Sequence, residues 1–333
     1  MNKLTKIGVS ALCGSLAGIV SAQAGELTVS GGATATWTTL SQGTTGNPIG
    51  LSTGMTFAGS GELDNGTAVT LTLTHTDQSA YSGGNIKMVT PSMGTFQIGH
   101  SGGGVDRWDD KMPTAWEETN GTGLSTGLNT VAGAGRGTNV EWALPADMMP
   151  DGLAAYIAWA PASGGASASD KGVGGDTAGN GTAWDVALSH SSLMDGLEVF
   201  AGYSSTERPS QHDGDRTNKV IGATYAISGF TVGYQYSENN YNNVGDNVVS
   251  YYENDAYAVS YSVNDDLSIS WGVHKSTQKK TGGGTVELDG ESIQLAYSMG
   301  GASIKFAETK ADDAFYNTAK DHEATTVALT LAF

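Results

Sequence analysis

The last eleven residues of the chain, Glu323-Ala-Thr-Thr-Val-Ala-Leu-Thr-Leu-Ala-Phe333, alternate between two kinds of side chain. Large apolar residues occupy every second position from Val327 to Phe333, and alanine or threonine occupies the positions between them. Successive side chains of a β-strand point to opposite faces of a sheet. The segment therefore predicts a strand with one large apolar face and one face of small, mostly polar residues.

The same alternation recurs along the whole chain after residue 24. We identify sixteen such segments of about ten residues each, the length typical of a strand that crosses an outer membrane, and we find no convincing helical period. In one of them, for example, Leu153, Ile157 and Trp159 fall on the same face. The opposite positions are mainly Thr, Ser, Gly, Ala and Gln.

The polar faces of these segments indicate where the sheet must lie. In a β-sandwich the inward face is apolar and tightly packed, whereas this sequence offers no second apolar layer to cover the first. The apolar face must then meet lipid and the polar face must meet water. A closed barrel pairs every backbone group and leaves no free edge in hydrocarbon. We therefore predict an all-β fold, a 16-stranded antiparallel transmembrane β-barrel around a water-filled lumen.

The predicted connections alternate between short and long. The short ones carry the Gly, Asn and Asp residues of tight turns, and they lie at 64–66, 91–94, 194–196, 228–229, 264–266 and 300–301. The long ones are polar and acidic, and they lie at about 101–135, 161–181, 207–217, 239–254, 278–289 and 310–322. Short periplasmic turns and longer external loops are typical of bacterial barrels.

Residues 1–24 have the parts of a secretory signal peptide. Lys3 and Lys6 precede a short apolar stretch at 7–20, and small residues at alternate positions follow it. This pattern predicts cleavage at the end of the segment and export through the periplasm. The mature chain, 25–333, is then expected to be one barrel domain.

Two other interpretations of the N-terminus fit less well. A membrane anchor needs roughly 20 apolar residues, and this apolar stretch is shorter and contains Gly and Ser. A lipoprotein cysteine would follow a small residue, whereas Cys13 follows Leu12. Removal of the signal peptide also removes the only cysteine, so the mature chain is expected to form neither a disulfide nor a thiolate metal site.

The charge balance excludes one class of partner. The chain carries 16 Lys+Arg and 34 Asp+Glu, a net charge of −18. Loss of Lys3 and Lys6 with the signal peptide would make the net charge −20. Nucleic-acid partners are not expected, because phosphates require a basic surface. An acidic chain attracts cations in preference to anions.

Several motifs occur in an order that resembles one protein family. A Gly94-Thr-Phe-Gln-Ile-Gly99 segment leads into the longest loop, Asn139-Val-Glu-Trp142 follows that loop, and the chain ends in Phe333. The second motif also includes Arg136, Pro145 and Gly152. Across the mature chain the sequence resembles Gram-negative outer-membrane porins of the general-diffusion, alphaproteobacterial-like type. The Pro-Glu-Phe-Gly motif common in enterobacterial relatives is absent from the loop.

The resemblance implies a location and partners. The alternation of Leu329, Leu331 and Phe333 resembles the signal that the barrel assembly machinery of the Gram-negative outer membrane reads. The resemblance further implies a homotrimer in contact with outer-membrane lipid and lipopolysaccharide. Small outward residues at the start of the barrel, such as Gly31 and Ala33, are compatible with a wall that faces protein.

The resemblance also implies that the longest loop, the third, folds into the barrel. A barrel of sixteen strands is otherwise too wide to discriminate small solutes, and charge at the narrowest point selects which ions pass. The candidate constriction residues are Asp106, Arg107, Asp109, Asp110, Lys111, Glu117 and Glu118. The alternative is a solvated surface loop. Asp106, Asp109 and Asp110 are also a candidate Ca²⁺ site, because clustered carboxylates suit hard cations; no other cofactor is expected.

The predicted lumen wall offers few basic residues to face this loop. The inward or near-inward basic residues are Lys87, Arg136 and Lys305. The inward acidic residues are Glu141, Asp185 and Glu198. We therefore predict a weaker transverse field than related porins have, together with a preference for cations.

These features favour a passive channel for small hydrophilic solutes and ions over three alternatives. A substrate-selective channel should have an aromatic track along the lumen, and we find only Tyr156 and Phe200 inward. A secreted β-rich adhesin or calcium-binding protein should show a fixed-period repeat, which is not evident. The sequence shows no grouped nucleophile, base and acid, so we do not expect an enzyme.

Overall fold

The structure is a computed structural model that describes residues 25–41, 46–77, 83–100, 102–119, 121, 124–134, 138–163, 181–208 and 214–333. The predicted signal peptide, 1–24, lies outside the described residues, as does Arg136.

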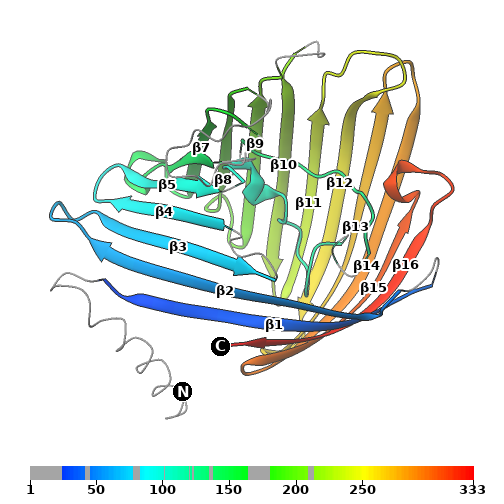
Figure 1. Cartoon of the computed structure of the whole chain (residues 1–333), viewed down its shortest axis with the longest axis horizontal. Coiled ribbons are helices and arrows are strands. Elements are labelled where there is room, and N and C mark those ends of the chain that lie inside the picture. The colour runs from blue at the N-terminus through cyan, green and yellow to red at the C-terminus, as the bar shows by residue number, and fades with distance from the viewer. Residues whose placement is uncertain are drawn as a thin grey trace.

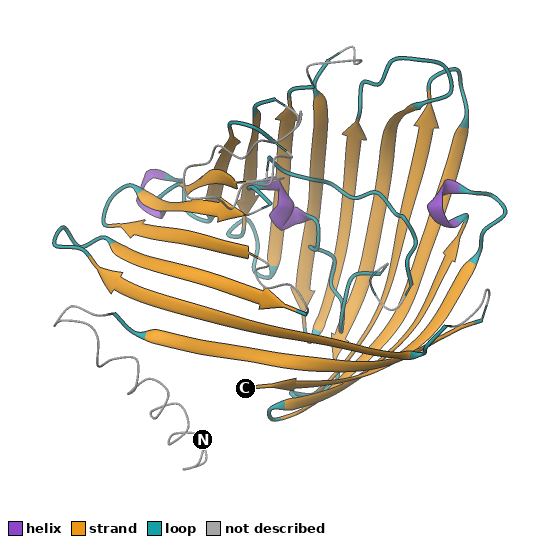
Figure 2. Cartoon of the chain, viewed as in Figure 1, coloured by secondary structure: helices purple, strands orange, loops and turns teal. Residues whose placement is uncertain are grey.

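The described residues form sixteen β-strands (Figures 1 and 2). They are β1 (Leu27–Leu40), β2 (Ile49–Glu62), β3 (Ala68–Thr76), β4 (Gly83–Thr90), β5 (Gly94–His100), β6 (Thr138–Ala143), β7 (Leu153–Ala160), β8 (Ala183–His190), β9 (Leu197–Thr206), β10 (Arg216–Ile227), β11 (Phe230–Asn240), β12 (Val249–Ser262), β13 (Leu267–Lys280), β14 (Thr285–Met299), β15 (Ala302–Asp312) and β16 (His322–Ala332). Each strand pairs antiparallel with its sequence neighbours, and β16 pairs with β1 to close the barrel. The predicted strand number, strand direction and closure are confirmed.

The seam of the barrel joins the first strand to the last. Ala35 on β1 lies opposite Leu329 on β16 in the antiparallel register. At the end of the seam, Gly31 N donates to Phe333 O at 3.0 Å and Phe333 N donates to Gly31 O at 2.9 Å. The C-terminal residue therefore has its backbone paired in both directions.

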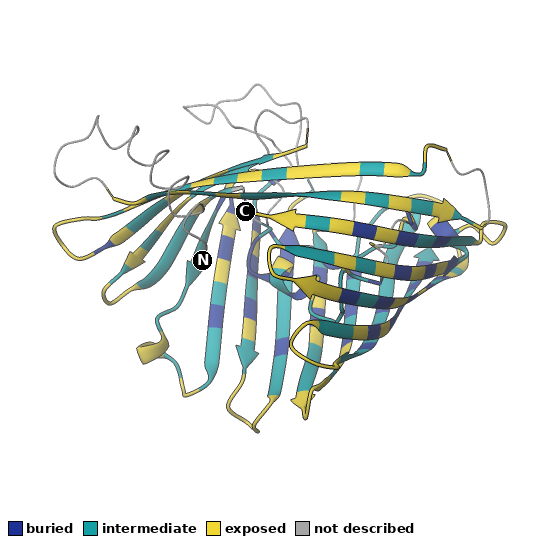
Figure 3. Ribbon diagram, turned by 90° about the horizontal axis from the view of Figure 1, so that it is seen from below, coloured by how far each residue is buried: buried dark blue, intermediate teal, exposed yellow. Residues whose placement is uncertain are grey.

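The two faces of the sheet differ as the alternation predicted. Large apolar side chains on one face have no protein cover, and the exposed fraction reaches 70% for Leu51 and 60% for Ile221. Polar side chains at the intervening positions are covered, with Asn254 and Gln294 each only 2% exposed. Figure 3 shows exposed and buried positions alternating along the strands. This is the reverse of a water-soluble protein, and it fits an outer face that meets hydrocarbon.

Four of the expected long loops are shorter than predicted, because the strands that flank them are longer. β12 and β13 have 14 residues each and β14 has 15. The expected loop at 278–289 is reduced to a turn between Lys280 and Thr285. Charged residues replace apolar ones at the outward positions there and hide the period, yet they pair across strands: Lys275 Nζ lies 2.5 Å from Asp289 Oδ2, and Lys279 contacts Glu253.

The predicted tight turns all connect consecutive strands. Between β10 and β11, Ser228 and Gly229 both have positive φ, 49° and 83°. Two successive residues in this conformation are typical of the two-residue hairpin turn whose twist matches that of the strands. Three short 3₁₀ helices complete the described elements, η2 (Val105–Trp108), η3 (Ala146–Met148) and η4 (Ala314–Tyr316).

Among the described residues, we find no helix with the length and apolar character needed to cross a membrane.

Candidate functional site

The longest connection, residues 102–134 between β5 and β6, lies against the polar face of the barrel. Its 3₁₀ helix η2 packs on β8 and β9 (Figure 1). Val105 and Trp108 of η2 are buried in one apolar cluster with Phe200, and the rings of Trp108 and Phe200 stack with centroids 5.1 Å apart. Phe200 points inward, as the sequence predicted, but it serves as a packing surface for this segment.

Asp185 on β8 joins the two ends of the segment. Its Oδ1 accepts a hydrogen bond from Gly104 N at 2.9 Å, and its Oδ2 accepts one from Ala134 N at 2.7 Å. The side chain is completely buried. A Cβ atom on Gly103 would lie only 2.3 Å from Asp185 Oδ2. The glycines near the start of the segment therefore allow the backbone to approach this carboxylate.

Two wall carboxylates hold the two cations of the segment. Arg107 Nη2 lies 2.5 Å from Glu141 Oε1, and Lys111 Nζ lies 2.6 Å from Glu198 Oε2. The Arg107 guanidinium also lies over the ring of Tyr156, 3.7 Å from its centroid. A carboxylate therefore balances the charge of each cation and holds its side chain in position.

The middle of the segment contacts the opposite side of the barrel. Ala115 N donates to Ser270 Oγ on β13 at 2.8 Å. Trp116 N donates to Gln294 Oε1 on β14 at 3.0 Å, and Gln294 Nε2 donates to Glu117 O at 2.7 Å. In a closed barrel of sixteen strands, β13 stands opposite β5, from which the segment starts.

The return half of the segment is held by η4 and β9. Phe315 N donates to Thr126 O at 2.7 Å, and Asn129 N donates to the Tyr316 hydroxyl at 2.8 Å. Ser204 Oγ on β9 donates to Ala132 O at 2.8 Å. Backbone groups of the segment thus find side-chain or backbone partners along most of its described length, which limits its freedom to move.

Four acidic side chains of the segment lie close enough to influence one another: Asp106, Asp109, Asp110 and Glu118. Burial raises the pKa of Asp109 to about 7, and the neighbouring Asp110 and Asp106 add to this rise. Burial also raises the pKa of Glu118 to about 7, with Asp110 and Asp109 as further causes. The pKa of Asp106 is raised for the same two reasons. Asp109 and Glu118 therefore change charge close to neutral pH.

Glu117 and Lys305 form a second charged group, near β14 and β15. Burial raises the pKa of Glu117, and the nearby Lys305 ammonium partly opposes this. Lys305 Nζ lies 5.7 Å from the centroid of the Trp116 ring. The predicted wall lysine thus faces the segment, close to one of its acids.

A polar cavity of about 380 Å³ separates the start of the segment from β4 to β7. Lys87, the other predicted wall lysine, lines it together with Asp106, Arg107 and Glu141. Mixed charge therefore surrounds this cavity, whereas acids dominate further along the segment.

A profile of the Gram-negative porin family matches residues 8–333. This chain belongs to that family. Gram-negative porins are β-barrel channel proteins of the outer membrane, and the closed barrel described above agrees with this membership. No curated protein matches the chain.

Solved porin structures share the fold. OmpF of Salmonella typhi, in complex with daunomycin, has a TM-score of 0.69 at 14% identity, with 93% of this chain and 98% of that chain covered. The trimer form of in-vitro folded OmpT, an outer membrane protein of Vibrio cholerae, has a TM-score of 0.68 at 14% identity, with 93% and 100% covered. A porin refined at 1.8 Å has a TM-score of 0.65 at 14% identity, with 92% and 100% covered.

The structure of this porin brings most of the predicted site residues together, with two qualifications. Arg136 lies outside the described residues. Among the described residues, no group of three His, Cys, Asp or Glu side chains is arranged to hold a metal ion, and calcium at Asp106, Asp109 and Asp110 stays a prediction. Of the predicted wall acids, Asp185 holds backbone, and Glu141 and Glu198 hold cations.

Several residues that position the segment were not predicted from sequence. Ser270, Gln294 and Tyr316 contact its backbone from strands or turns far away in the chain. The only signal was that Ser270 and Gln294 fall at inward positions of their strands, as many serines and glutamines do. Tyr316 lies in a predicted loop and gave no signal.

Proposed function

We propose that this porin is a passive, cation-preferring channel for small hydrophilic solutes and ions, and that the segment 102–134 folds inward and narrows its lumen. The observation that carries the proposal is the charge left over along that segment. Its cations, Arg107 and Lys111, pair with wall carboxylates. Its acids take part in no ion pair among the described residues: Asp106, Asp109, Asp110 and Glu118.

Contacts on both sides of the barrel support the narrowing role. Asp185 anchors the segment on β8, and Gln294 anchors it on β14. A chain segment that meets opposite walls reduces the width available to solutes, and its uncompensated carboxylates repel anions over roughly a Debye length of 8 Å at physiological salt.

Reversal potentials across a planar bilayer under a KCl gradient test the ion preference. We expect K⁺ to permeate better than Cl⁻. Neutralising two acids of the segment, in the double variant Asp110→Asn and Glu118→Gln, should lower the permeability ratio several-fold. Asp246→Asn removes an exposed acid from the connection between β11 and β12 and serves as a matched control that should change little. Equal permeability of the two ions in the unaltered porin would contradict cation preference.

We further propose that the porin assembles as a homotrimer after export with removal of 1–24. Trimeric OmpT shares the fold, and small outward residues on β1 and β2 offer a flat wall for neighbouring protomers: Gly31, Ala33, Ala35, Gly59 and Gly61. Its membrane partners would be lipid, lipopolysaccharide and the assembly machinery. Light scattering of the detergent-solubilised protein tests the trimer, and a monomeric mass would contradict it.

One observation favours a substrate-selective channel as a second candidate. The lumen contains more aromatic side chains than the sequence indicated, because Tyr252 lies between Tyr241 and Tyr316 with ring centroids 5.7 and 5.0 Å away. The Arg216 guanidinium lies 4.3 Å from the centroid of Tyr241. If this cluster binds sugars by stacking, maltose should reduce the ion current, and Tyr252→Ala should abolish that effect. An unchanged current at millimolar sugar would dismiss this candidate.

A further inference from the structure

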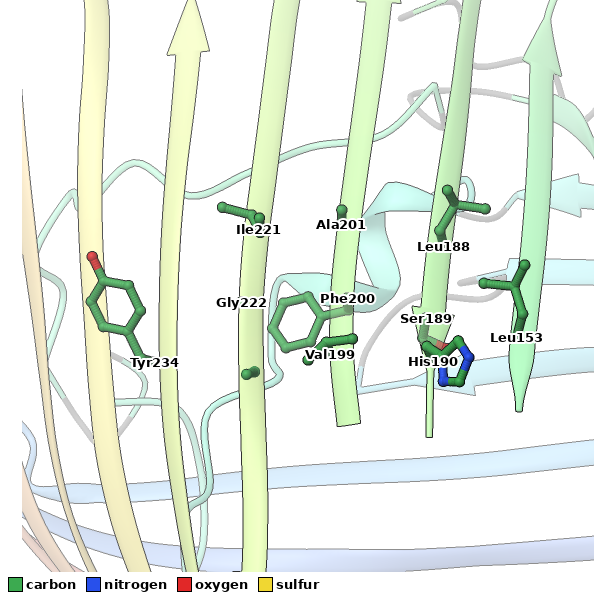
Figure 4. Close-up of a pocket in the computed structure, with 11 residues that line it drawn as sticks. Leu153, Leu188, Ser189, His190, Val199, Phe200, Ala201, Ile221, Gly222 and Tyr234 are labelled. Carbon is green, nitrogen blue, oxygen red and sulfur yellow. The ribbon is translucent and has the colours of Figure 1, made fainter. Parts of the chain in front are cut away.

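An apolar groove of about 520 Å³ is open on the outer face of the barrel, over β7 to β11 (Figure 4). Ala201 and Ala223 are the smallest outward side chains that line it, and the larger side chains of Leu188, Ile221 and Tyr234 line it as well. In the strand register, Ala201 lies between Leu188 and Ile221, and Ala223 lies next to Tyr234. None of the residues that line the groove is acidic, lysine or arginine.

The groove runs from the turn end of the barrel toward the middle of the wall. Leu153 begins β7 and His190 ends β8, next to the short connection before β9. Ile221 and Tyr234 lie in the interior of β10 and β11. Short connections lie on the periplasmic side in barrels of this class, so the groove opens in the periplasmic half of the membrane.

One polar group marks the periplasmic end of the groove. Ser192 N donates to His190 Nδ1 at 3.3 Å. This hydrogen bond leaves Nε2 of the imidazole as the atom that can donate to a ligand. Polar and apolar parts are therefore arranged along the groove as headgroup and tail are arranged in a lipid of that leaflet.

The groove faces away from the wall proposed for trimer contacts. In the closed barrel β9 stands opposite β1, and the small outward residues of that proposed wall lie on β1 and β2. The groove is continuous with exposed apolar side chains on the same strands, such as Trp184 at 44% exposure. Given the trimer wall proposed above, the groove therefore faces membrane lipid and not a neighbouring protomer.

We infer that this groove holds one acyl chain of a phospholipid from the periplasmic leaflet, with the phosphate or ester group next to His190. An extended hydrocarbon chain is long enough to fill the groove, which the surrounding side chains leave empty. The close packing that results favours one bound lipid over lipids that exchange freely. Lipopolysaccharide occupies the external leaflet and would approach the barrel from the opposite end.

The experiment replaces small side chains of the groove by larger ones and measures how much phospholipid stays bound. The full-length porin is reconstituted in vesicles of phosphatidylethanolamine and phosphatidylglycerol, extracted in mild detergent and weighed by native mass spectrometry. We expect one phospholipid per protomer to remain bound. The double variant Ala201→Leu and Ala223→Leu should lose at least nine-tenths of it, while Ala302→Leu, an outward alanine on β15, should retain it.

Two further measurements separate the other occupants. A phosphatidylethanolamine with a photoreactive acyl chain should label peptides of β8 to β11 in the unaltered porin and not in the double variant. Conductance should be equal in all three proteins, which shows that the barrel has folded. If the double variant binds as much phospholipid as the unaltered porin, the inference is wrong. Retention of lipopolysaccharide in place of phospholipid, or a change of oligomeric state when the groove is filled, would also overturn it.

Discussion

The Asp185 carboxylate accepts a hydrogen bond from the backbone of Gly104, which lies 81 residues earlier in the chain. The same carboxylate accepts a second bond from Ala134, so one side chain of the wall holds both ends of the segment proposed to narrow the lumen. Buried backbone N–H groups need partners. The position of the segment therefore depends on this one acid more than on any single ion pair, since each ion pair is partly exposed.

Replacing this acid by alanine should loosen the segment. Asp185→Ala leaves at least two buried N–H groups without an acceptor, at a cost of about 1–3 kcal/mol each. We expect a larger and noisier single-channel current, with an intermediate effect for Asp185→Asn, which keeps one acceptor oxygen. Glu207→Ala is a matched control, because Glu207 also accepts a backbone bond, from Thr182, at a different connection. A quiet, unchanged current in Asp185→Ala would show that these two hydrogen bonds are not needed to hold the segment in place.

A methyl group at Gly103, on the segment itself, should disturb the same hydrogen bonds to Asp185. The added Cβ would lie 2.3 Å from Asp185 Oδ2, and Gly103 has a φ of 88° that other residues rarely adopt. Gly282→Ala provides the comparison, because Gly282 has a similar φ of 85° and nothing within 4 Å of its added Cβ. We expect the current noise of Gly103→Ala to exceed that of Gly282→Ala. Similar noise in the two variants would assign the effect to backbone conformation alone.

Ion selectivity should depend on pH near neutrality. Burial and neighbouring carboxylates raise the pKa of Asp109 and of Glu118 to about 7. Below that pH both groups are increasingly protonated and neutral, and above it both are increasingly ionised. The preference for K⁺ over Cl⁻ should therefore increase from pH 6 to pH 8 in reversal-potential measurements. The double variant Asp109→Asn and Glu118→Gln should show a flatter dependence, and an equal slope would rule these groups out as its source.

The strands could be predicted from sequence because each outward side chain meets lipid without depending on any distant residue. That argument failed at the strand ends where outward side chains are charged and no longer apolar. Glu253, Lys279 and Asp289 interrupt the apolar period, and only their cross-strand partners reveal that they lie on strands. Sequence also identified Asp185 as an inward charge but not its role. Some inward carboxylates face water, and others accept hydrogen bonds from a distant loop. Both kinds occupy inward positions of the alternation, so the sequence pattern does not distinguish them.

The seam between the first and last strands provides the final prediction. Gly31 and Phe333 exchange two backbone hydrogen bonds, and a Cβ on Gly31 would lie 2.6 Å from Gly54 O and 3.1 Å from the Phe333 ring. Gly31→Val should therefore hinder closure and lower the yield of heat-modifiable, folded barrel in a refolding assay by several-fold. Gly61→Val is the control, because Gly61 on β2 also points outward and has nothing within 4 Å of an added Cβ. If both variants fold equally well, the close contact at the seam does not limit closure. Phe333→Ala separates the two roles of the C-terminal residue: it removes the ring but keeps the backbone pair, so it should refold in detergent while its assembly in cells declines.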